Sequence, residues 1–352
     1  MSVSDAVEDV GAEFTAHRGR LFGLAYRMLG SAMDAEDVVQ DAFLRWSGAD
    51  HAAIAAPGAW LARTTTNLCL DLLTSARVRR ERYVGPWLPE PVLTEDGVLG
   101  PHDQAQQRDS VSLAMLALLE RLTPTERAVF VLREAFGYDH ASIADILGCS
   151  TANSRQLHSR ARRRLEQDSV AGAEPRREPH PGHAPHPRSH TDAADVRRLV
   201  ERFLAAAREG DLAELESMLT ADVVSWSDGG GQISAARHPI VGAMKVGRLF
   251  MGLARKAGAD ARADVREING EPALVITVPD RPTPDRPTPD RATPDHTTPD
   301  HTPGRATPDQ IVVIALEIAD GRIAGVRAVV NPDKLRYLRH QLSHSLPLSS
   351  PS

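Results

Sequence analysis

Apolar residues recur at three- and four-residue spacing through most of the first 168 positions, which predicts a series of amphipathic helices. The first predicted helix carries its apolar positions at Phe14, Leu21, Leu24, Ala25 and Met28. Gly30 and Ser31 break it, and Asp34 opens a second helix with a stripe at Val38, Val39, Ala42, Phe43 and Trp46. A third begins at Pro57, with its inner stripe at Trp60, Leu61, Thr64, Leu68 and Leu72. Residues 11–82 are therefore predicted to form one helical domain.

A second helical unit is predicted over residues 109–168, after a connector at 83–108 that proline and glycine keep irregular. Within it, Thr123 and Glu126 have the spacing of a capping box around Pro124. Ile143 and Ile146 share a helical face that Gly148 terminates, and the stripe resumes at Leu157, Ala161 and Leu165. Two short helices joined by a glycine turn are typical of a helix-turn-helix.

The second helix of this pair is rich in arginine. Its register predicts that Ser154, Arg155, His158 and Arg162 point away from the apolar stripe. Such a face suits the major groove of DNA, with some arginines on phosphates and others on base edges. The alternative is an exposed helix whose charges only keep it in solution. The glycine turn between two periodic helices favours DNA binding.

After a Pro/His-rich linker at 169–191, residues 192–345 change character. Two helical stripes ending near Leu219 precede five segments with strand patterns, VVSWSD, ADVREI, ALVITV, QIVVIALEI and RIAGVRAVV. Helices followed by strands indicate an α+β domain. A charged five-residue repeat at about 280–309 interrupts the strands. We expect ALVITV and IVVIAL to pair, with the repeat as their long connection.

Composition sets the limits of the function. With 352 residues the chain is long enough for two or three domains, each able to bury its own core. A net charge of −6 means that contacts with nucleic acid must come from local basic patches. Cys69 and Cys149 lie far apart, so no disulfide framework or zinc site is indicated. We expect no metal, cofactor or membrane partner, and a cytoplasmic location, since no leader or spanning segment is recognisable.

The segment AYRMLGSAMDAEDVVQDAFLRW (25–46), with the Pro57 helix and the helix-turn-helix, resembles bacterial sigma factors of the extracytoplasmic-function group. Four further segments, YVGPWLPEP, WSDGGGQ, INGEPALV and NPDKL, resemble in the same order the subgroup with a fused SnoaL-like domain. The resemblance implies a multi-domain fold. Two all-α sigma domains, region 2 and the helix-turn-helix region 4, would precede an α+β SnoaL-like cone-shaped barrel.

The resemblance also implies roles for particular residues. Region 2 would bind core RNA polymerase through Asp37 and Asp41, and region 4 would read the −35 element of promoter DNA through the arginine-rich helix. Melting of the −10 element would use a loop at 50–56, Trp60 as a less favoured member, and a polar and basic row. That row consists of Arg63, Asn67, Asp71, Arg77, Arg79 and Arg80.

For the third domain the resemblance implies contacts that regulate the sigma module in cis, because a tether makes even weak contacts effective. The expected contact residues are Trp87, Leu88, Pro89, Asp228, Gly229, Gly230, Asn331, Pro332, Asp333, Lys334 and Leu335. Gln232 stands where the subgroup has lysine. Three alternatives remain open. They are residual isomerase or cyclase chemistry through Asp228 with Trp226 and His238, an unknown small-molecule ligand, and a ligand-sensing repressor that needs no polymerase.

Overall fold

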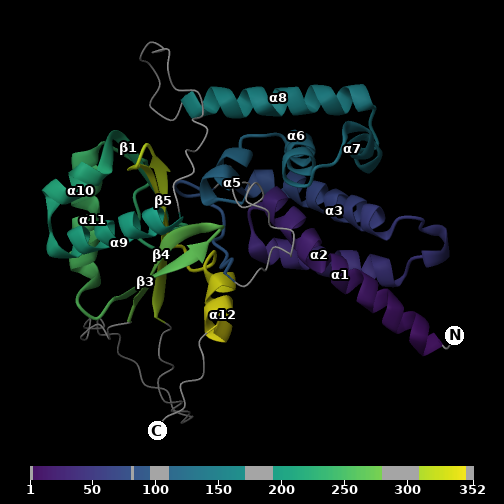
Figure 1. The fold of residues 1–352 in the computed structure, drawn as a ribbon, viewed down its shortest axis with the longest axis horizontal. Coiled ribbons are helices and arrows are strands. Elements are labelled where there is room, and N and C mark those ends of the chain that lie inside the picture. The colour runs from purple at the N-terminus through teal and green to yellow at the C-terminus, as the bar shows by residue number, and fades with distance from the viewer. Residues whose placement is uncertain (1–2, 81–82, 96–110, 171–192, 280–308, 346–352) are drawn as a thin grey trace, which may run out of the picture.

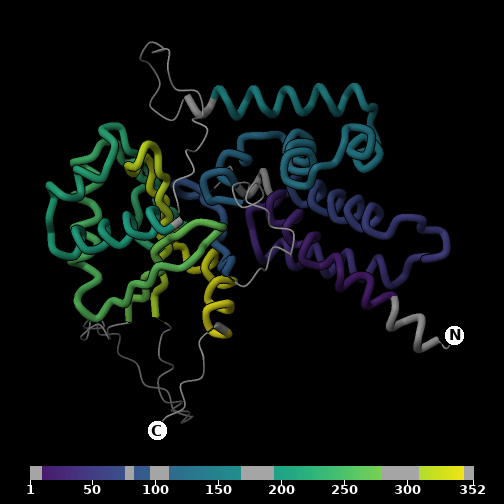
Figure 2. The backbone as a smooth tube through the Cα atoms, in the orientation of Figure 1, coloured from purple at the N-terminus to yellow at the C-terminus, as the bar shows by residue number. Residues whose placement is uncertain are grey.

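A computed structural model of the chain describes residues 3–80, 83–95, 111–170, 193–279 and 309–345 (Figure 1). A group of helices from the N-terminal half lies beside a second body of helices and strands from the C-terminal half (Figure 2). Within these ranges, none of the helices combines the length and apolarity that crossing a membrane requires.

The first helical unit contains α1 (Val3–Leu29), α2 (Ala32–Ser47), the short 3-10 turn η1 (His51–Ala53) and α3 (Pro57–Arg80). Gly30 takes a positive φ of 66° between α1 and α2, as the predicted break requires. Ser31 caps α2 by accepting a hydrogen bond from the Asp34 amide, so the helix begins two residues before the predicted start. The predicted burial of Phe43 is wrong, because its side chain is 39% exposed.

The buried side of α3 is broader than the predicted stripe. The fully buried positions include Leu61, Thr65, Cys69 and Leu73, whereas Trp60, Thr64 and Leu72 are only partly buried. The cause is that α3 contacts α1 and α2 on one side and α6 and α7 on another. A helix packed on two sides needs apolar or small residues over more than one stripe.

The second helical unit consists of α5 (Leu113–Leu119), α6 (Pro124–Phe130), a π-helical turn η2 (Val131–Ala135), α7 (His140–Leu147) and α8 (Thr151–Val170). The capping box of Thr123 and Glu126 is confirmed at the start of α6. Gly148 ends α7 in the left-handed conformation with φ 62°, which a glycine adopts without strain. The predicted helix-turn-helix is therefore confirmed as α7 and α8.

The two helical units share one hydrophobic core. A single cluster of buried side chains runs from Phe22 and Leu61 to Leu132, Ile143 and Leu157. Sequence length suggested that each unit could bury its own core, but the apolar faces of the two units instead cover one another. In the described residues the sigma-like half is one packed body.

In the part of the chain that the structure describes, the C-terminal body combines a sheet with three helices on one face and a fourth on the other. Its helices are α9 (Ala193–Glu209), α10 (Leu212–Met218), α11 (Ala243–Ala257) and α12 (Arg336–Ser345). Its strands are β1 (Leu219–Asp228), β2 (Ile240–Val241), β3 (Arg262–Ile268), β4 (Glu271–Val278), β5 (Gln310–Ala319) and β6 (Arg322–Val329). The strand order is β2-β1-β6-β5-β4-β3, with β1 and β6 parallel and the other neighbours antiparallel.

The predicted α+β layout is confirmed, and so is the antiparallel pairing of β4 with β5. The repeat between these strands lies outside the described residues. Helices α11 and α12 are additions that the sequence pattern did not predict. Alternate strand residues point to opposite sides of the sheet. The two faces pack against different elements of the molecule.

On one face, Ile314 and Leu316 pack with α9, α10 and α11. On the other face, Val313 lies in a cluster with Leu88 and Leu93 of the connector, Leu113 of α5 and Leu338 of α12. The C-terminal domain therefore buries one side of its sheet against the connector, the start of the second helical unit and its own last helix.

Candidate nucleic-acid interface and the docked C-terminal domain

Helix α8 has one buried side and one open side. Ser154 is completely buried and lies 3.0 Å from His140 Nδ1, in line with the buried Leu157 and Ala161. His158 is turned inward as well, since its Nε2 lies 2.7 Å from Glu134 Oε1 and its ring lies beside that of Phe130. The outward orientation predicted for Ser154 and His158 is therefore wrong. The stripe begins one turn earlier than the apolar residues indicate, because a serine occupies its first buried position.

The open side of α8 keeps two of the predicted residues, Arg155 and Arg162. Arg162 lies 3.8 Å from Glu166, both well exposed, so solvent screens this pair. The same side carries Arg163, which adds charge as the sequence indicated, and three residues that sequence reasoning missed, namely Asn153, Gln156 and Ser159. Asparagine, glutamine and arginine are the side chains that pair with base edges in the major groove. The helical register could have revealed these residues, but a polar residue, Ser154, occupies the first buried position and made the register difficult to assign from sequence.

Two other arginines of α8 form ion pairs that stabilise the packing of this helix on the rest of the domain. Arg164 Nη1 lies 2.6 Å from the buried carboxylate of Glu126, and Arg160 Nε lies 3.7 Å from it. The same carboxylate caps α6 through Thr123. Glu126 thus fixes the position of α8 relative to α6, which orients the open face.

The outer face of α3 presents Arg63, Asn67 and Asp71, all exposed and four residues apart. Four-residue spacing aligns them in one row along the helix. The helix continues through Arg77, Arg79 and Arg80, whose side chains lie outside the described part of the chain. The structure thus places three of the six predicted residues on a common open surface.

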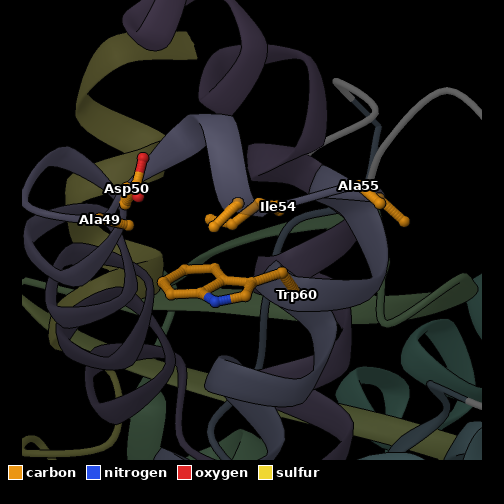
Figure 3. A pocket seen from close by; sticks show the side chains of 7 residues that line it. Ala49, Asp50, Ile54, Ala55 and Trp60 are labelled. Atoms are coloured by element: carbon orange, nitrogen blue, oxygen red, sulfur yellow. The ribbon is translucent and has the colours of Figure 1, made fainter.

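A pocket of about 440 Å³ opens next to this row and is formed by Ala49, Asp50, residues 53–56 and Trp60. In Figure 3, the indole of Trp60 and the side chain of Ile54 lie against one another, with Asp50 across the opening. Asp50 also caps η1 by accepting from the Ala52 amide at 3.2 Å. Trp60 packs against Trp46 at a centroid distance of 5.6 Å, so it serves both the core and the pocket wall.

Helix α2 presents Asp37 and Asp41 to solvent, as predicted. Met33 and Leu44 flank them along the same side of the helix and are 43% and 61% exposed. The surface is therefore mixed apolar and acidic rather than purely acidic. Exposed apolar side chains grouped in this way are typical of a protein-binding face.

The connector is held in the C-terminal domain by a buried ion pair. Asp228 at the end of β1 is fully buried and accepts from Lys334 Nζ and the Leu88 amide, both at 2.7 Å, and from Tyr83 Oη at 2.5 Å. Lys334 also donates to the Leu88 carbonyl and lies 3.9 Å above the Trp87 ring. Burial, followed by the hydrogen bond to Asp228, raises the pKa of the Tyr83 phenol.

The neighbouring predicted residues complete this attachment. Asn331 donates to Tyr83 Oη at 2.8 Å, and its amide group lies so close to Gly230 that a Cβ there would sit 2.2 Å from Nδ2. A Cβ on Gly229 would meet the Ile233 carbonyl. Leu335 is buried in the same cluster as Leu88, while Pro89 is buried and Pro332 partly buried.

Asp333 does not join the connector. Its carboxylate is bound by Gln232 and Arg336, all within the C-terminal domain. The direct contact predicted for Asp333 is therefore wrong in the described part of the chain, because its exposed side chain stabilises the turn before α12. Asp333 still acts on the connector through its charge, since burial and then Asp228 raise the pKa of Tyr83 and Asp333 raises it further. Gln232 supplies an amide donor to Asp333 at the position where a lysine was expected.

Glu90 is a contact residue that sequence reasoning missed. Its carboxylate accepts from Ala32 N at 2.8 Å, Ser31 Oγ at 2.9 Å and Met33 N at 3.2 Å, so it covers the N-terminus of α2. Burial raises the pKa of Glu90, with these hydrogen bonds opposing the shift. Glu90 lies within the YVGPWLPEP segment, so the resemblance of that segment to the subgroup could have indicated it as a contact residue.

Helix α12 supplies a second missed contact. The ring of Tyr337 stacks on Phe22 of α1 at 5.9 Å, and its hydroxyl lies 3.2 Å from Glu36 Oε1 of α2. Burial, followed by the nearby Glu36 carboxylate, raises the pKa of Tyr337. The C-terminal domain thus contacts the first helical unit directly as well as through the connector.

Comparisons with known proteins assign these parts to a family. The family description "Sigma-70 region 2" matches residues 14–79, and "Sigma-70, region 4" matches residues 112–165. The ECF RNA polymerase sigma factor SigJ of Mycobacterium tuberculosis is 38% identical over 249 residues, which are 70% of this chain and 74% of SigJ. The chain belongs to the ECF RNA polymerase sigma factors.

Two further comparisons support this sigma factor assignment. A probable ECF sigma factor SigI of the same organism is 35% identical over 243 residues, 68% of this chain and 75% of SigI. The crystal structure of M. tuberculosis SigJ gives a TM-score of 0.63 at 31% identity, covering 92% of this chain and 97% of SigJ. The predicted family and function are confirmed. The chain is an alternative sigma factor for transcription initiation, in a family that binds core RNA polymerase and promoter DNA.

In this sigma factor the three candidate residues for catalysis, Asp228, Trp226 and His238, lie in different surroundings. The Asp228 carboxylate is fully engaged with the connector, and Trp226 lies under the Arg327 guanidinium at 4.5 Å. His238 is exposed in the segment between β1 and β2. General acid or base chemistry requires a titratable group that can reach a substrate, which the engaged Asp228 cannot.

Proposed function

We propose that the C-terminal domain of this sigma factor is a non-catalytic regulator in cis, which holds regions 2 and 4 in a closed arrangement that must open on the promoter. Here region 2 denotes α1 to α3 and region 4 denotes α5 to α8. The observation that carries the proposal is that one domain touches both regions and the connector between them. Its contacts are Tyr337 on region 2, Lys334 on the connector and Asn269 at the start of region 4.

Regions 2 and 4 are also packed directly on each other. Arg127 of α6 is buried and donates to the Met28 carbonyl of α1 at 2.8 Å. From region 2, the Arg20 guanidinium lies 5.3 Å from the Phe136 ring centre, and that of Arg27 lies 5.4 Å from it. These contacts would hold the two DNA-binding surfaces at a fixed, short separation.

A length comparison supports the need for opening. The −35 and −10 elements lie about 25 base pairs apart, or about 85 Å of DNA at 3.4 Å per base pair. A compact body of about 160 residues is about 40 Å across by the usual scaling of the radius of gyration. The closed form is too short to engage both elements at once, so contacts that stabilise it oppose promoter binding.

Disruption of the Tyr337 contact should release the closed form. We expect Tyr337→Ala in the full chain to raise transcription from a cognate promoter at least about threefold, since an aromatic residue packed into an interface can contribute about 1 kcal/mol or more. The measurement is multiple-round transcription with core RNA polymerase at limiting sigma factor. His340→Ala, an exposed position on the same helix, is the matched control and should match the wild type.

Lower or unchanged output from Tyr337→Ala, with normal thermal unfolding, would contradict the proposed inhibition. Lower output would mean that the docked domain assists initiation. Unchanged output would mean that the α12 contact has no regulatory effect.

For region 4, we propose that Arg155, with Asn153, Gln156 and Ser159, reads the −35 element. Arg155→Ala should weaken binding to the cognate −35 sequence about tenfold, because a base-edge contact contributes about 1–3 kcal/mol. Fluorescence anisotropy with matched and scrambled −35 duplexes measures this. Arg198→Ala, an exposed arginine of α9, is the control, and an equal loss on both duplexes would refute a role in base reading.

For region 2, we propose that the pocket beside Trp60 takes up an unstacked base of the −10 element, with Arg63, Asn67 and Asp71 along the strand. The support is a wall with an aromatic face, next to an exposed polar row. Asp37, Asp41 and the exposed Met33 and Leu44 would bind core polymerase.

Two other functions are compatible with a helix-turn-helix joined to an α+β domain. A repressor that works without polymerase leaves region 2 without a purpose, and the family assignment argues against it. A small-molecule ligand for the C-terminal domain stays a prediction, as does the cytoplasmic location that fits a transcription factor.

A further inference from the structure

The turn between β3 and β4 reaches from the C-terminal domain into the junction of the sigma regions. Asn269 and Gly270 form this two-residue turn, both with positive φ, 55° and 76°. Such a turn matches the twist of a hairpin and favours an Asn-Gly pair. A turn residue of this kind is normally exposed, yet Asn269 is only 1% exposed.

The connector runs along the edge of the same hairpin. Leu93 bridges Ile268 in antiparallel fashion, and Thr94 N donates to the Glu267 carbonyl at 3.0 Å. Glu95 binds Arg266 with both carboxylate oxygens, at distances between 2.8 and 3.0 Å. The connector therefore extends the sheet beyond β3, as an added strand does when a peptide binds a sheet edge.

Asn269 uses its whole amide group at this junction. It forms two hydrogen bonds with Val92. The Asn269 backbone N donates to the Val92 carbonyl at 2.9 Å, and the Val92 backbone N donates to Asn269 Oδ1 at 3.0 Å. Its Nδ2 donates to Tyr26 Oη of region 2 and to the Val111 carbonyl at the start of region 4, both at 2.7 Å. Tyr26 Oη in turn donates to the Glu90 carbonyl of the connector at 2.5 Å.

We propose that Asn269 is the positioning residue that couples docking of the C-terminal domain to the relative placement of regions 2 and 4. One side chain links the three segments whose separation defines opening, namely α1, the connector and the residues just before α5. Because every partner is buried, loss of the amide leaves unpaired polar groups that water cannot reach in the closed form. The inference rests on the proposed closed form and identifies the residue that connects its parts.

The simpler explanation is that asparagine merely suits the left-handed turn. Two variants separate the explanations. Asn269→Gly keeps the backbone conformation, since glycine adopts positive φ without strain, but removes the amide. Asn269→Asp keeps Oδ1 for Val92 and the volume of the side chain, but replaces the two donors aimed at Tyr26 and Val111.

The matched control is Asp320→Gly. Asp320 and Gly321 form the β5–β6 turn with nearly the same angles, φ 50° and 74°, but Asp320 is exposed. If asparagine acts only through turn geometry, glycine should have equally small effects at both turns. If Asn269 acts through its amide, only the β3–β4 turn should respond.

The test is hydrogen exchange on the full-length chain, followed over residues 111–119, to which Asn269 is hydrogen-bonded through the Val111 carbonyl. Exchange of protected amides reports the opening equilibrium. We expect Asn269→Gly and Asn269→Asp each to speed exchange in this segment about tenfold, the size expected when buried hydrogen bonds are lost. Asp320→Gly should leave it unchanged.

Wild-type exchange in both Asn269 variants would overturn the inference, even if Tyr337→Ala alters transcription and so supports the proposed function. Conversely, faster exchange in the Asn269 variants with no change in transcription from either those variants or Tyr337→Ala would support the coupling and refute the proposed regulation. Thermal unfolding of each variant confirms that the chain is folded.

Discussion

Lys334→Met should destabilise the C-terminal domain and its connector by about 3–5 kcal/mol, the usual cost of removing one partner from a buried ion pair. The substitution leaves Asp228, fully buried, without its cation. It also removes the ammonium group from the rings of Trp87 and Tyr83. Urea unfolding with a probe in the C-terminal domain measures the loss, and proteolysis within residues 83–95 should become faster.

A double-mutant cycle with Asp228→Asn tests the cause. In the Asp228→Asn background, Lys334→Met should lower the free energy of unfolding by markedly less than it does in the wild type. The reason is that most of the loss in the wild type comes from leaving the buried Asp228 carboxylate without a cation, and little comes from lost packing. Strictly additive losses would instead show that the two side chains act independently.

Arg127→Met should loosen region 4 from region 2 and lower stability by about 3 kcal/mol, since a buried guanidinium with several hydrogen bonds is lost together with its partners. Arg127 is 2% exposed and binds the Leu119 carbonyl, the Met28 carbonyl and Glu120 Oε1 at 2.8–2.9 Å. Burial lowers its pKa to about 9, so the group remains charged at neutral pH. Methionine fills most of the volume but leaves these acceptors unpaired.

The control for Arg127 is Arg133→Met. Arg133 is exposed, and its guanidinium donates to the carbonyl of Tyr138, five residues away, at 3.0 Å. Thermal unfolding should shift strongly for Arg127→Met and little for Arg133→Met. Equal small shifts would mean that Arg127 is not a principal contact between the regions.

The periodic apolar pattern predicted most helices and strands because their buried faces follow from spacing alone. It failed where a polar residue occupies a buried position or an apolar one is exposed. Ser154 is buried against His140, which displaced the predicted face of α8. Phe43 and Leu44 are apolar but exposed on α2, and the ring of Phe43 makes an edge contact with that of Phe14, at a centroid distance of 5.0 Å.

The docking contacts were predicted in part, through the segments that carry Lys334, Asp228 and Asn331. Asn269 lies within the quoted INGEPALV segment. The partners of Asn269 and Tyr337 could still not be found from sequence, because they are distant along the chain and belong to other parts of the fold. Asn269 in particular carries an ordinary turn signal, and only the three-dimensional arrangement reveals that Tyr26 and Val111 lie within reach of its amide.

The most direct test of the closed form is the distance between the two regions, measured by fluorescence energy transfer. Dyes can be placed at Ala16→Cys in α1 and Gln167→Cys in α8, both exposed positions, in a Cys149→Ser background. Cys69 is buried, and burial raises the pKa of its thiol, so it should stay unlabelled. We predict one compact distance in the free chain and a clearly longer one with core RNA polymerase and promoter DNA. An unchanged distance in the promoter complex would contradict the account.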